Sequence, residues 1–452
     1  MGAVDRIDRR NWLYYIMYYY VRSVFNQYYR KVEVHGLENI PKDAPVIFAP
    51  NHQNALMDAL IVLFSSPGDT VFLARADLFR KKFLAWALNS LKILPVFRIR
   101  DGVDELGKNQ EIFDITVGVL HRKHQLCLMP EGNHGDKRRL RNLGKGIFRI
   151  AFKTQEEKGN QPYVKIVPVG LDFSDYIKHH QTLHVNYGKP IEVSDYWDTF
   201  QENGPRGLNH LKQRLADDLK PLMIHIDTEE YYDMYMGLRT VYNARMRERL
   251  NIEGSKLQDR FNADKEMIAR LNATLEKDEQ KLVPLKEKVE GYFAKLNQLD
   301  IRDWVVVSRG YSFGRSLWRW FTLLLTLPVF VYGFINNALM YFIPVQMVRK
   351  VKDIQFHSSI KAGASFLISG PLSYGIQTAL VAIFTGGWYW WLGYLVTVYP
   401  MGKLALLWYV RTKKTWHGAR FRRLLRRNDN LAVEAVKLRE EIVSEAEEVM
   451  VW

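Results

Sequence analysis

The chain has 452 residues, enough for about two or three domains, and a formal charge of +15 from 64 Lys and Arg against 49 Asp and Glu. Its single cysteine, Cys127, excludes an intrachain disulfide and a cysteine-rich metal site. The positive charge suits nucleic acid, anionic lipid or a phosphorylated substrate, and the 13% of aromatic residues favours a membrane interface among these.

Residues 1–31 form the first predicted region. They do not have the pattern of a cleavable signal peptide, and the apolar stretch Trp12–Phe25 is interrupted by Arg22 and short for a membrane span. The stretch is rich in tyrosine and flanked by arginine and lysine, so we expect an interfacial amphipathic helix. A buried N-terminal helix is the alternative.

Residues 32–225 alternate short apolar runs with amphipathic segments, which predicts an α/β domain with a mostly parallel sheet flanked by helices. The predicted strands are Val46–Ala49, Val71–Ala74, Leu94–Phe97, Leu126–Met129, Val164–Leu171 and His184–Tyr187. The predicted helices are Ala55–Phe64, Phe83–Leu91, Asn109–Arg122, Ile147–Glu157 and Asn209–Leu222.

Residues 226–314 are charged, poor in glycine and interrupted by Pro284. Their apolar residues recur at helical spacing, so we expect two or three amphipathic helices, packed as a hairpin or against the preceding domain. A solvated helical linker is the alternative.

Residues 315–410 have the composition of a membrane region, with three long apolar segments, Leu317–Val348, Ala362–Phe384 and Trp388–Val410. Basic residues flank the last two segments, and the short connector Thr385-Gly386-Gly387 is uncharged, which predicts a transmembrane hairpin with its basic ends in the cytoplasm. The first segment has basic residues at both ends, and we expect a re-entrant or interfacial hairpin there. Residues 411–452 form a basic and then acidic cytoplasmic tail, with a solvated helix over Glu434–Glu448.

A histidine and an aspartate, His52 and Asp58, lie six positions apart in the stretch PNHQNALMD, between an apolar strand and an apolar helix. On one continuous helix, six steps of about 100° would put their side chains on opposite sides. They can meet if His52 lies in the loop and Asp58 in the first turns of the helix, where Asp58 would hold Nδ1–H and leave Nε2 free to take a proton. The alternative is a structural turn, in which Asn51 or Asn54 caps the helix.

Three further stretches contain candidate binding residues. Arg98 and Arg100 follow a predicted strand at alternate positions, so their side chains point to the same side, a geometry that suits binding a phosphate. The alternative is that they form surface salt bridges with nearby aspartates. Glu131 and Gly132 begin a Gly-rich loop in which Glu131 could accept hydrogen bonds from a polyol. The alternative is a flexible, solvated loop without a binding role. The loop also carries four basic residues that could meet phosphate or lipid: Lys137, Arg138, Arg139 and Arg141.

Pro168 interrupts the fourth stretch, Val164–Leu171, and a proline there predicts an edge strand or a strand end. We expect this strand to support packing near the site and to line an acyl channel.

Together the four stretches, in this order over about Val32–Tyr187 and after the lead-in VHGLENIP, resemble the glycerolipid acyltransferase superfamily of glycerol-3-phosphate and 1-acylglycerol-3-phosphate acyltransferases. The resemblance implies that His52 is the general base, that Asp58 orients it, and that Arg98, or less directly Arg100, binds the acceptor phosphate. It also assigns substrate-binding positions to Glu131, Gly132 and Asn133, and supporting positions to Asn51 and Pro168.

Two features depart from the commonest family pattern. Five residues rather than four separate His52 from Asp58, which resembles the glycerol-3-phosphate/dihydroxyacetone-phosphate acyltransferase subgroup, whose members also carry membrane segments after the catalytic domain. The third block continues with Asn133 and His134, where the family usually has Thr followed by Arg or Ser.

The sequence therefore predicts a membrane-bound enzyme with its catalytic domain on the cytoplasmic face, in contact with membrane lipids but not nucleic acid. It would move a fatty acyl group from acyl-CoA or acyl-carrier protein to glycerol 3-phosphate or dihydroxyacetone phosphate in phospholipid biosynthesis, with no cofactor or metal. One alternative is a lysophosphatidate acyltransferase, and another is a non-catalytic lipid-binding membrane protein.

Overall fold

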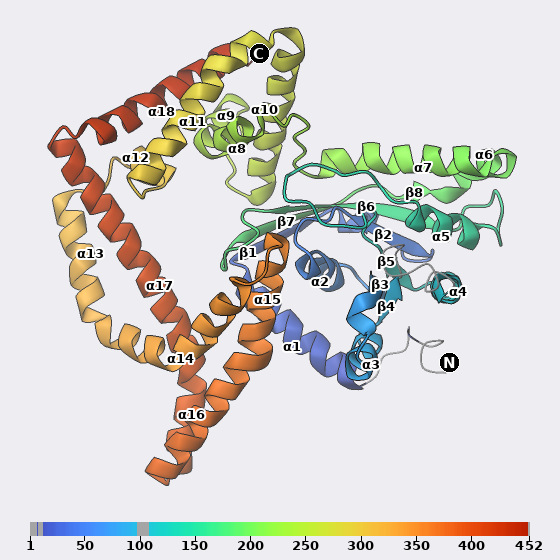
Figure 1. Cartoon of the computed structure of the whole chain (residues 1–452), viewed down its shortest axis with the longest axis horizontal. Coiled ribbons are helices and arrows are strands. Elements are labelled where there is room, and N and C mark those ends of the chain that lie inside the picture. The colour runs from blue at the N-terminus through green and yellow to red at the C-terminus, as the bar shows by residue number, and fades with distance from the viewer. Residues whose placement is uncertain (1–6, 8–11, 97–107, 451–452) are drawn as a thin grey trace. The chain divides into compact units, whose positions relative to one another are not determined.

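The computed structural model describes residue 7, residues 12–96 and residues 108–450, and the statements below concern these residues. The chain divides into two compact units. Unit 1 comprises Met1–His225 together with Val351–Ser359, and unit 2 comprises Ile226–Lys350 together with Ile360–Trp452 (Figure 1).

An eight-stranded sheet forms the centre of unit 1, in the order β1-β7-β6-β2-β5-β3-β4, with β8 also paired to β6. The strands are β1 (Lys31–His35), β2 (Val46–Pro50), β3 (Thr70–Arg75), β4 (Ile93–Val96), β5 (Gln125–Cys127), β6 (Lys165–Phe173), β7 (Thr182–Tyr187) and β8 (Ile191–Glu192). All pairs are parallel except β6–β7 and β6–β8. The predicted α/β class with a mostly parallel sheet is confirmed.

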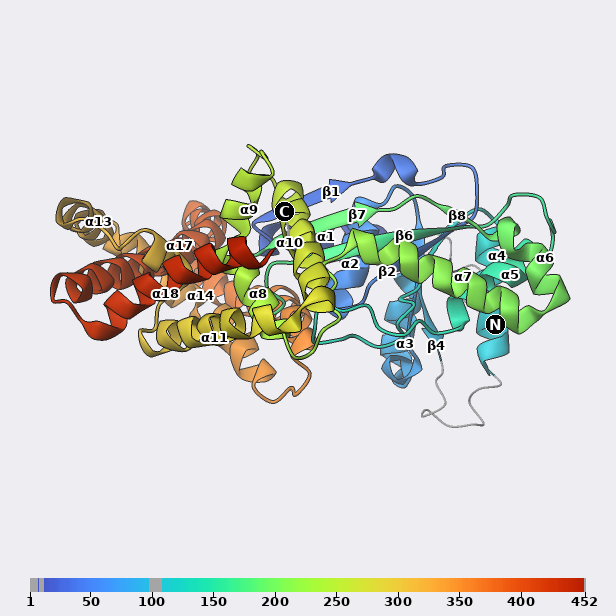
Figure 2. The same cartoon turned by 90° about the horizontal axis from the view of Figure 1, so that it is seen from above.

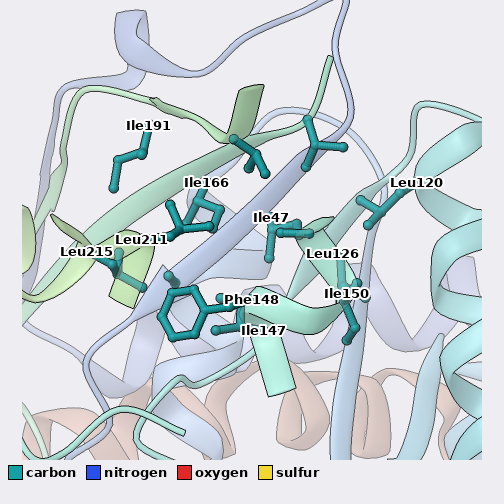
Figure 3. Close-up of a cluster of buried hydrophobic side chains, with 14 of the residues drawn as sticks. Ile47, Leu120, Leu126, Ile147, Phe148, Ile150, Ile166, Ile191, Leu211 and Leu215 are labelled. Carbon is teal, nitrogen blue, oxygen red and sulfur yellow. The ribbon is translucent and has the colours of Figure 1, made fainter. Parts of the chain in front are cut away.

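Helices cover both faces of this sheet, which explains why its strands are apolar without alternation. The helices of the domain are α1 (Trp12–Tyr28), α2 (Leu56–Ser65), α3 (Lys82–Ser90), α4 (Lys108–His121), α5 (Gly146–Gln155), α6 (Trp197–Glu202) and α7 (Gly204–Leu219). Ile47 of β2 faces the core formed with α4, α5 and α7 (Figure 3). Its neighbour Phe48 faces the other way and meets the Tyr187 ring, whose hydroxyl bonds Ser65 at the end of α2. Figures 1 and 2 show α7 and α2 on opposite faces of the sheet.

Helix α1 is amphipathic in the sense that one face is packed and the other is not. Its Tyr18 and Phe25 rings contact Phe64 of α2 at 5.5 and 5.4 Å between centroids. Trp12 and Tyr19 on the other face are exposed. An exposed aromatic face of this kind suits a membrane interface, which stays a prediction for this helix.

Pro168 lies in the interior of the sheet, so the prediction of an edge strand or strand end is wrong. Its strand β6 pairs with β2 on one side, where Ala49 is the partner of Pro168. On the other side β6 pairs with β8 up to Ile166 and with β7 from Val169 onward. The Pro168 carbonyl accepts a hydrogen bond from the Gly188 N–H on that side, so the missing proline N–H falls where β6 changes partner.

The second half of the chain is helical. Its helices are α8 (Tyr232–Val241), α9 (Asn243–Arg249), α10 (Leu257–Lys277), α11 (Leu282–Gln298), α12 (Asp303–Val307), α13 (Phe313–Leu325), α14 (Leu327–Val348), α15 (His357–Gly363), α16 (Gly370–Thr385), α17 (Trp388–Arg426) and α18 (Asn430–Val449). Pro284 lies in the first turn of α11, where a proline is tolerated.

The acidic tail is helical, as predicted, but the expectation of a solvated helix is wrong. Helix α18 packs against α11, and its small or apolar residues Ala435, Ile442 and Ala446 are buried. Lys295 of α11 forms an ion pair with Glu434 of α18, at 2.5 Å. The residues at i, i+7 and i+11 form one helix face, which the strongly acidic composition conceals.

The segment Leu317–Val348 is divided between two helices, and its expected arrangement as a re-entrant or interfacial hairpin stays a prediction. Helix α13 ends at Leu325, and α14 then runs without interruption from Leu327 to Val348. The polar Asn337 is accommodated because its amide donates to the carbonyl oxygens of Gly333 and of Val398 on α17.

Helices α16 and α17 form the predicted helical hairpin, joined at Gly386, which has a φ of 66°. Two helical segments, Leu327–Val348 and Ile354–Thr385, are long and apolar enough to cross a membrane. The apolar part of α17 continues as the same helix through the basic residues to Arg426.

Candidate functional site

The candidate site lies where two neighbouring parallel strands end. His52 follows β2, and Glu131 follows β5, its neighbour in the sheet. Loops at the carboxyl ends of parallel strands are where open α/β sheets bind their ligands.

His52 and Asp58 are in direct contact. His52 Nδ1 and Asp58 Oδ2 lie 2.8 Å apart, and the carboxylate is fully buried, whereas 17% of the imidazole side chain is exposed. Asp58 Oδ2 also accepts hydrogen bonds from the backbone N–H groups of Gln53 and Asn54, at 2.9 and 2.8 Å. The catalytic hypothesis requires this contact, and the catalytic role itself stays a prediction.

The backbone between His52 and Asp58 explains how residues six apart can meet. Ala55 has φ 46° and ψ −120°, a strained conformation for a residue with a Cβ, and α2 begins at the next residue. The chain therefore turns sharply after His52, so that the carboxylate of Asp58, in the first turn of α2, reaches the imidazole of His52. Neither the Asn51 nor the Asn54 side chain caps α2, so the alternative of a structural turn with an asparagine cap is wrong.

Glu131 supports the backbone of His52 rather than standing apart from it. Its Oε1 accepts the His52 N–H at 2.8 Å, and its Oε2 accepts the Arg141 N–H at 3.1 Å. Burial raises the pKa of Glu131 to about 7, against the opposing effect of those two N–H groups. Glu131 therefore contacts the backbone of His52. Its predicted contact with the substrate stays a prediction.

The loop after Glu131 is held to the His52 loop by backbone contacts. Gly132 has a φ of 68°, which favours glycine, and Asn133 is exposed. The Gly135 N–H donates to the His52 carbonyl at 3.1 Å.

The basic residues of this loop do not all face outward as the sequence suggested. Arg138 is buried, forms an ion pair with Asp172 and donates to the Phe173 carbonyl. A guanidinium with these partners anchors the loop to β6, so the expected phosphate role for Arg138 is wrong. Arg141 donates to the carbonyl oxygens of Asn133 and His134.

Asn51 has a clear structural role. It is buried, and its side chain exchanges two hydrogen bonds with the backbone of Leu171 on β6, at 2.7 and 3.2 Å. Pro168 lies in the same strand. Both residues therefore fix the end of β2, from which His52 projects. Arg98 and Arg100 lie outside the described residues, directly after β4.

Several residues near His52 were not singled out from the sequence. The His134 ring lies edge-on to the His52 ring at 5.7 Å between centroids, and Tyr176 donates to the Gln53 side chain. Phe356, far away in the sequence, meets His134. Only the proximity of His134 to Glu131 gave any local signal, because the other contacts join distant parts of the chain.

The site suits proton transfer from a hydroxyl. With Nδ1–H of His52 bonded to the Asp58 carboxylate, Nε2 is the basic nitrogen. Burial raises the pKa of the Cys127 thiol well above its usual range, so this residue stays a protonated core thiol. Within residues 12–96 and 108–450, no group of three or more His, Cys, Asp or Glu side chains is placed to hold a metal ion.

Part of the chain is similar to known proteins. Residues 31–172 match the family described as Acyltransferase. A 1-acyl-sn-glycerol-3-phosphate acyltransferase from Borreliella burgdorferi is 27% identical over 175 residues, which cover 37% of this chain. The chain spans 65% of the length of that curated relative.

One solved structure is also similar. It is the crystal structure of the 1-acyl-sn-glycerophosphate (LPA) acyltransferase PlsC from Thermotoga maritima, at 21% identity and a TM-score of 0.32. The match covers 45% of this chain and 78% of that chain.

The family match covers both β2 with its His52 loop and β5 with its Glu131 loop, and the curated relative carries the acyltransferase name. Residues 31–172 therefore match an acyltransferase domain, and in this part the chain is similar to the glycerolipid acyltransferases.

Proposed function

We propose that the protein transfers a fatty acyl group from an acyl thioester, acyl-CoA or acyl-carrier protein, to a hydroxyl of glycerol 3-phosphate or dihydroxyacetone phosphate. The observation that carries this proposal is the 2.8 Å contact between His52 Nδ1 and the buried Asp58 carboxylate at the ends of the parallel strands. A buried carboxylate that fixes the tautomer of a partly exposed imidazole is an arrangement that favours general base catalysis by the imidazole.

In the proposed mechanism, His52 Nε2 takes the proton of the acceptor hydroxyl as its oxygen attacks the thioester carbonyl. The resulting oxyanion would be stabilised by backbone N–H groups near the start of α2, where the helix dipole favours negative charge. Collapse of the tetrahedral intermediate expels the thiolate, which takes the proton back from His52. Direct transfer of this kind needs no acyl-enzyme.

The phosphate of the acceptor is assigned to Arg98, with Arg100 as the second candidate and Glu131, Gly132 and Asn133 near the glycerol. These assignments rest on the family resemblance. The five-residue spacing between His52 and Asp58 supports glycerol 3-phosphate or dihydroxyacetone phosphate as the acceptor.

A second candidate acceptor is lysophosphatidate, which would give phosphatidate as the product. It is favoured by the relative from Borreliella burgdorferi, which is named a 1-acyl-sn-glycerol-3-phosphate acyltransferase. Both candidates share the reaction at His52, but lysophosphatidate already carries an acyl chain, whereas glycerol 3-phosphate and dihydroxyacetone phosphate do not.

We further propose that the protein is membrane-bound, with its catalytic domain on the cytoplasmic face. The apolar helical hairpin α16–α17, with basic residues before and after it and an uncharged turn at its tip, supports this arrangement. Acyl chains partition into the bilayer, so attachment there shortens the path of the substrates.

An acceptor panel tests the proposal. Purified full-length protein in detergent is given one acyl-CoA and, separately, glycerol 3-phosphate, dihydroxyacetone phosphate or lysophosphatidate, and the products are identified by mass. A parallel series uses acyl-carrier protein as the donor. We expect a mono-acylated product from one of the first two acceptors. Transfer to lysophosphatidate alone would favour the second candidate, and no transfer to any of the three would contradict the proposal.

A further inference from the structure

The segment Val351–Ser359 connects two long apolar helices, α14 and the helical run that ends in α16, yet it belongs to unit 1. It begins as an irregular link, forms the short 3₁₀ helix Ile354–Phe356, and then enters α15. The His357 side chain meets the Val351 carbonyl at 2.9 Å, which closes the segment on itself. The segment therefore has a defined conformation and differs in this from a flexible linker.

Three contacts join this segment to the two loops of the candidate site. The Phe356 ring lies edge-on to the His134 ring, at 4.8 Å between centroids and 83° between planes. The Gln355 side chain donates to the Gly135 carbonyl at 3.2 Å. The Ser358 hydroxyl donates to the Tyr176 carbonyl.

Each of these partners is in turn in contact with the His52 loop. The His134 ring is edge-on to the His52 ring, at 5.7 Å and 86°. The Gly135 N–H donates to the His52 carbonyl at 3.1 Å, and the Tyr176 hydroxyl donates to the Gln53 side chain. Three chains of contacts thus run from one short segment to His52 and its neighbour.

His134 is the member of these chains that is nearest to the imidazole. It is half-buried, and burial, followed by the nearby His52, lowers its pKa. At neutral pH it is therefore an uncharged ring, and it affects its surroundings through shape and hydrogen bonding. The nearby charged groups are Asp353 on the segment, Asp58 on α2 and Arg75 on β3.

We propose that Val351–Ser359 is part of the acceptor site, and that Phe356 is a positioning residue that holds His134 against His52 and thereby sets which glycerol phosphate acceptor is used. This inference rests on the proposed acyl transfer and deepens it. The Asp58 side of the imidazole is occupied, so an acceptor must approach elsewhere, and the His134 ring borders His52. A small misplacement of that ring is enough to affect an aligned proton transfer.

The test compares Phe356→Ala with two matched variants in full-length protein. Phe356→Trp keeps an aromatic ring at the same position. Ile354→Ala removes a large apolar side chain from the same 3₁₀ helix, but one that is about half exposed, at 48%. Thermal unfolding of all three shows whether the fold is retained.

The first measurement does not depend on any substrate. Diethyl pyrocarbonate modifies accessible imidazoles, and the modified histidines are located by mass spectrometry. We expect Phe356→Ala to raise the modification rates of His134 and His52 several-fold, while Phe356→Trp and Ile354→Ala leave them at the wild-type rates. Equal rates for Phe356→Ala and the wild type would overturn the proposed packing role.

The second measurement is acyl transfer with each acceptor. Phe356→Ala should lower kcat/KM for the preferred acceptor about tenfold or more, change the ratio between acceptors, and leave the KM for the acyl donor unchanged. Phe356→Trp should restore most of the loss. An active wild type with an unchanged acceptor ratio in Phe356→Ala would overturn this inference alone. A wild type that acylates no acceptor would overturn the proposed function together with the claim about selectivity.

Discussion

Asp58 concentrates three hydrogen bonds on one oxygen, Oδ2, from the His52 ring and from two backbone N–H groups of the same loop. Asp58 is also fully buried, so its negative charge is shielded from water and interacts mainly with these three groups. The pair is thus more than two residues of the right type, because one carboxylate fixes both the loop and the imidazole.

Replacing Asp58 with Asn should therefore impair catalysis more than folding. The amide keeps an acceptor for the backbone N–H groups but lacks the negative charge that orients and stabilises a protonated His52. We expect kcat to fall about 100-fold or more, within the usual range for disrupting general base catalysis. Asp114→Asn, on the exposed face of α4, is the control. Turnover within a few-fold of wild type for Asp58→Asn would contradict the role given to Asp58.

Glu131 gives a pH prediction for stability. Because burial raises its pKa from 4.5 to about 7, the folded state binds more protons than the unfolded state between these values. Its contribution to stability is complete below about pH 4.5 and is lost as the pH rises through about 7. Glu131→Gln cannot titrate, so its midpoint of thermal unfolding should fall less than that of the wild type across this window. Parallel curves for the two proteins would show that Glu131 has no raised pKa.

At the scale of elements, the sheet is fixed by close approaches as well as by apolar runs. Gly170 of β6 has no room for a side chain, since an added Cβ would lie 1.9 Å from the Leu222 carbonyl oxygen. Residues Lys220–Leu222 form the short 3₁₀ helix that follows α7. A single methyl group at position 170 would therefore push this segment away from β6.

Gly170→Ala should destabilise the protein by about 1–3 kcal/mol, the usual cost of overpacking a tight contact. Gly146, at the exposed start of α5, meets nothing within 4 Å at its Cβ position, so Gly146→Ala should be neutral or slightly stabilising. Chemical unfolding of both variants measures the difference. Equal stabilities would mean that the segment after α7 does not pack on β6 as described.

Much of the α/β domain could be predicted from local sequence. The apolar runs identified β2 to β7, because strands buried on both faces must be apolar. β1 was missed because KVEVH has polar residues at alternate positions and looks like surface sequence. Pro168 misled the prediction because its missing N–H falls at a change of partner strand, which no local pattern reveals.

In the candidate site, too, local sequence predicted some residues and missed others. His52, Asp58 and Glu131 lie next to their strands and helices in sequence, so their spacing predicted where they would be. Phe356 and Gln355 are more than 200 positions from the loops that they contact, and such long-range packing leaves no local signal. The buried face of α18 was concealed for a different reason, because its small alanines carry little hydrophobic weight within a strongly acidic segment.

For the whole molecule, the proposed topology makes a direct prediction. The single native cysteine, Cys127, is fully buried, so engineered cysteines can report the side of the membrane on which they lie. In intact cells, a membrane-impermeant thiol reagent should label Thr385→Cys, at the tip of the α16–α17 hairpin. It should label Lys437→Cys, on α18, only after the membrane is permeabilised. Labelling of both sites in intact cells would contradict a cytoplasmic C-terminal tail and with it the proposed topology.

The central claim is that His52 takes the proton of the acceptor hydroxyl, and the acyl transfer rate of His52→Ala tests it most directly. Purified wild type and variant are compared with the same acyl-CoA and the acceptor that the wild type prefers, after unfolding curves show that both are folded. We predict a loss of about 10²–10⁴-fold in kcat, since alanine cannot act as a base. A His52→Ala variant that works within a few-fold of the wild-type rate would contradict the account.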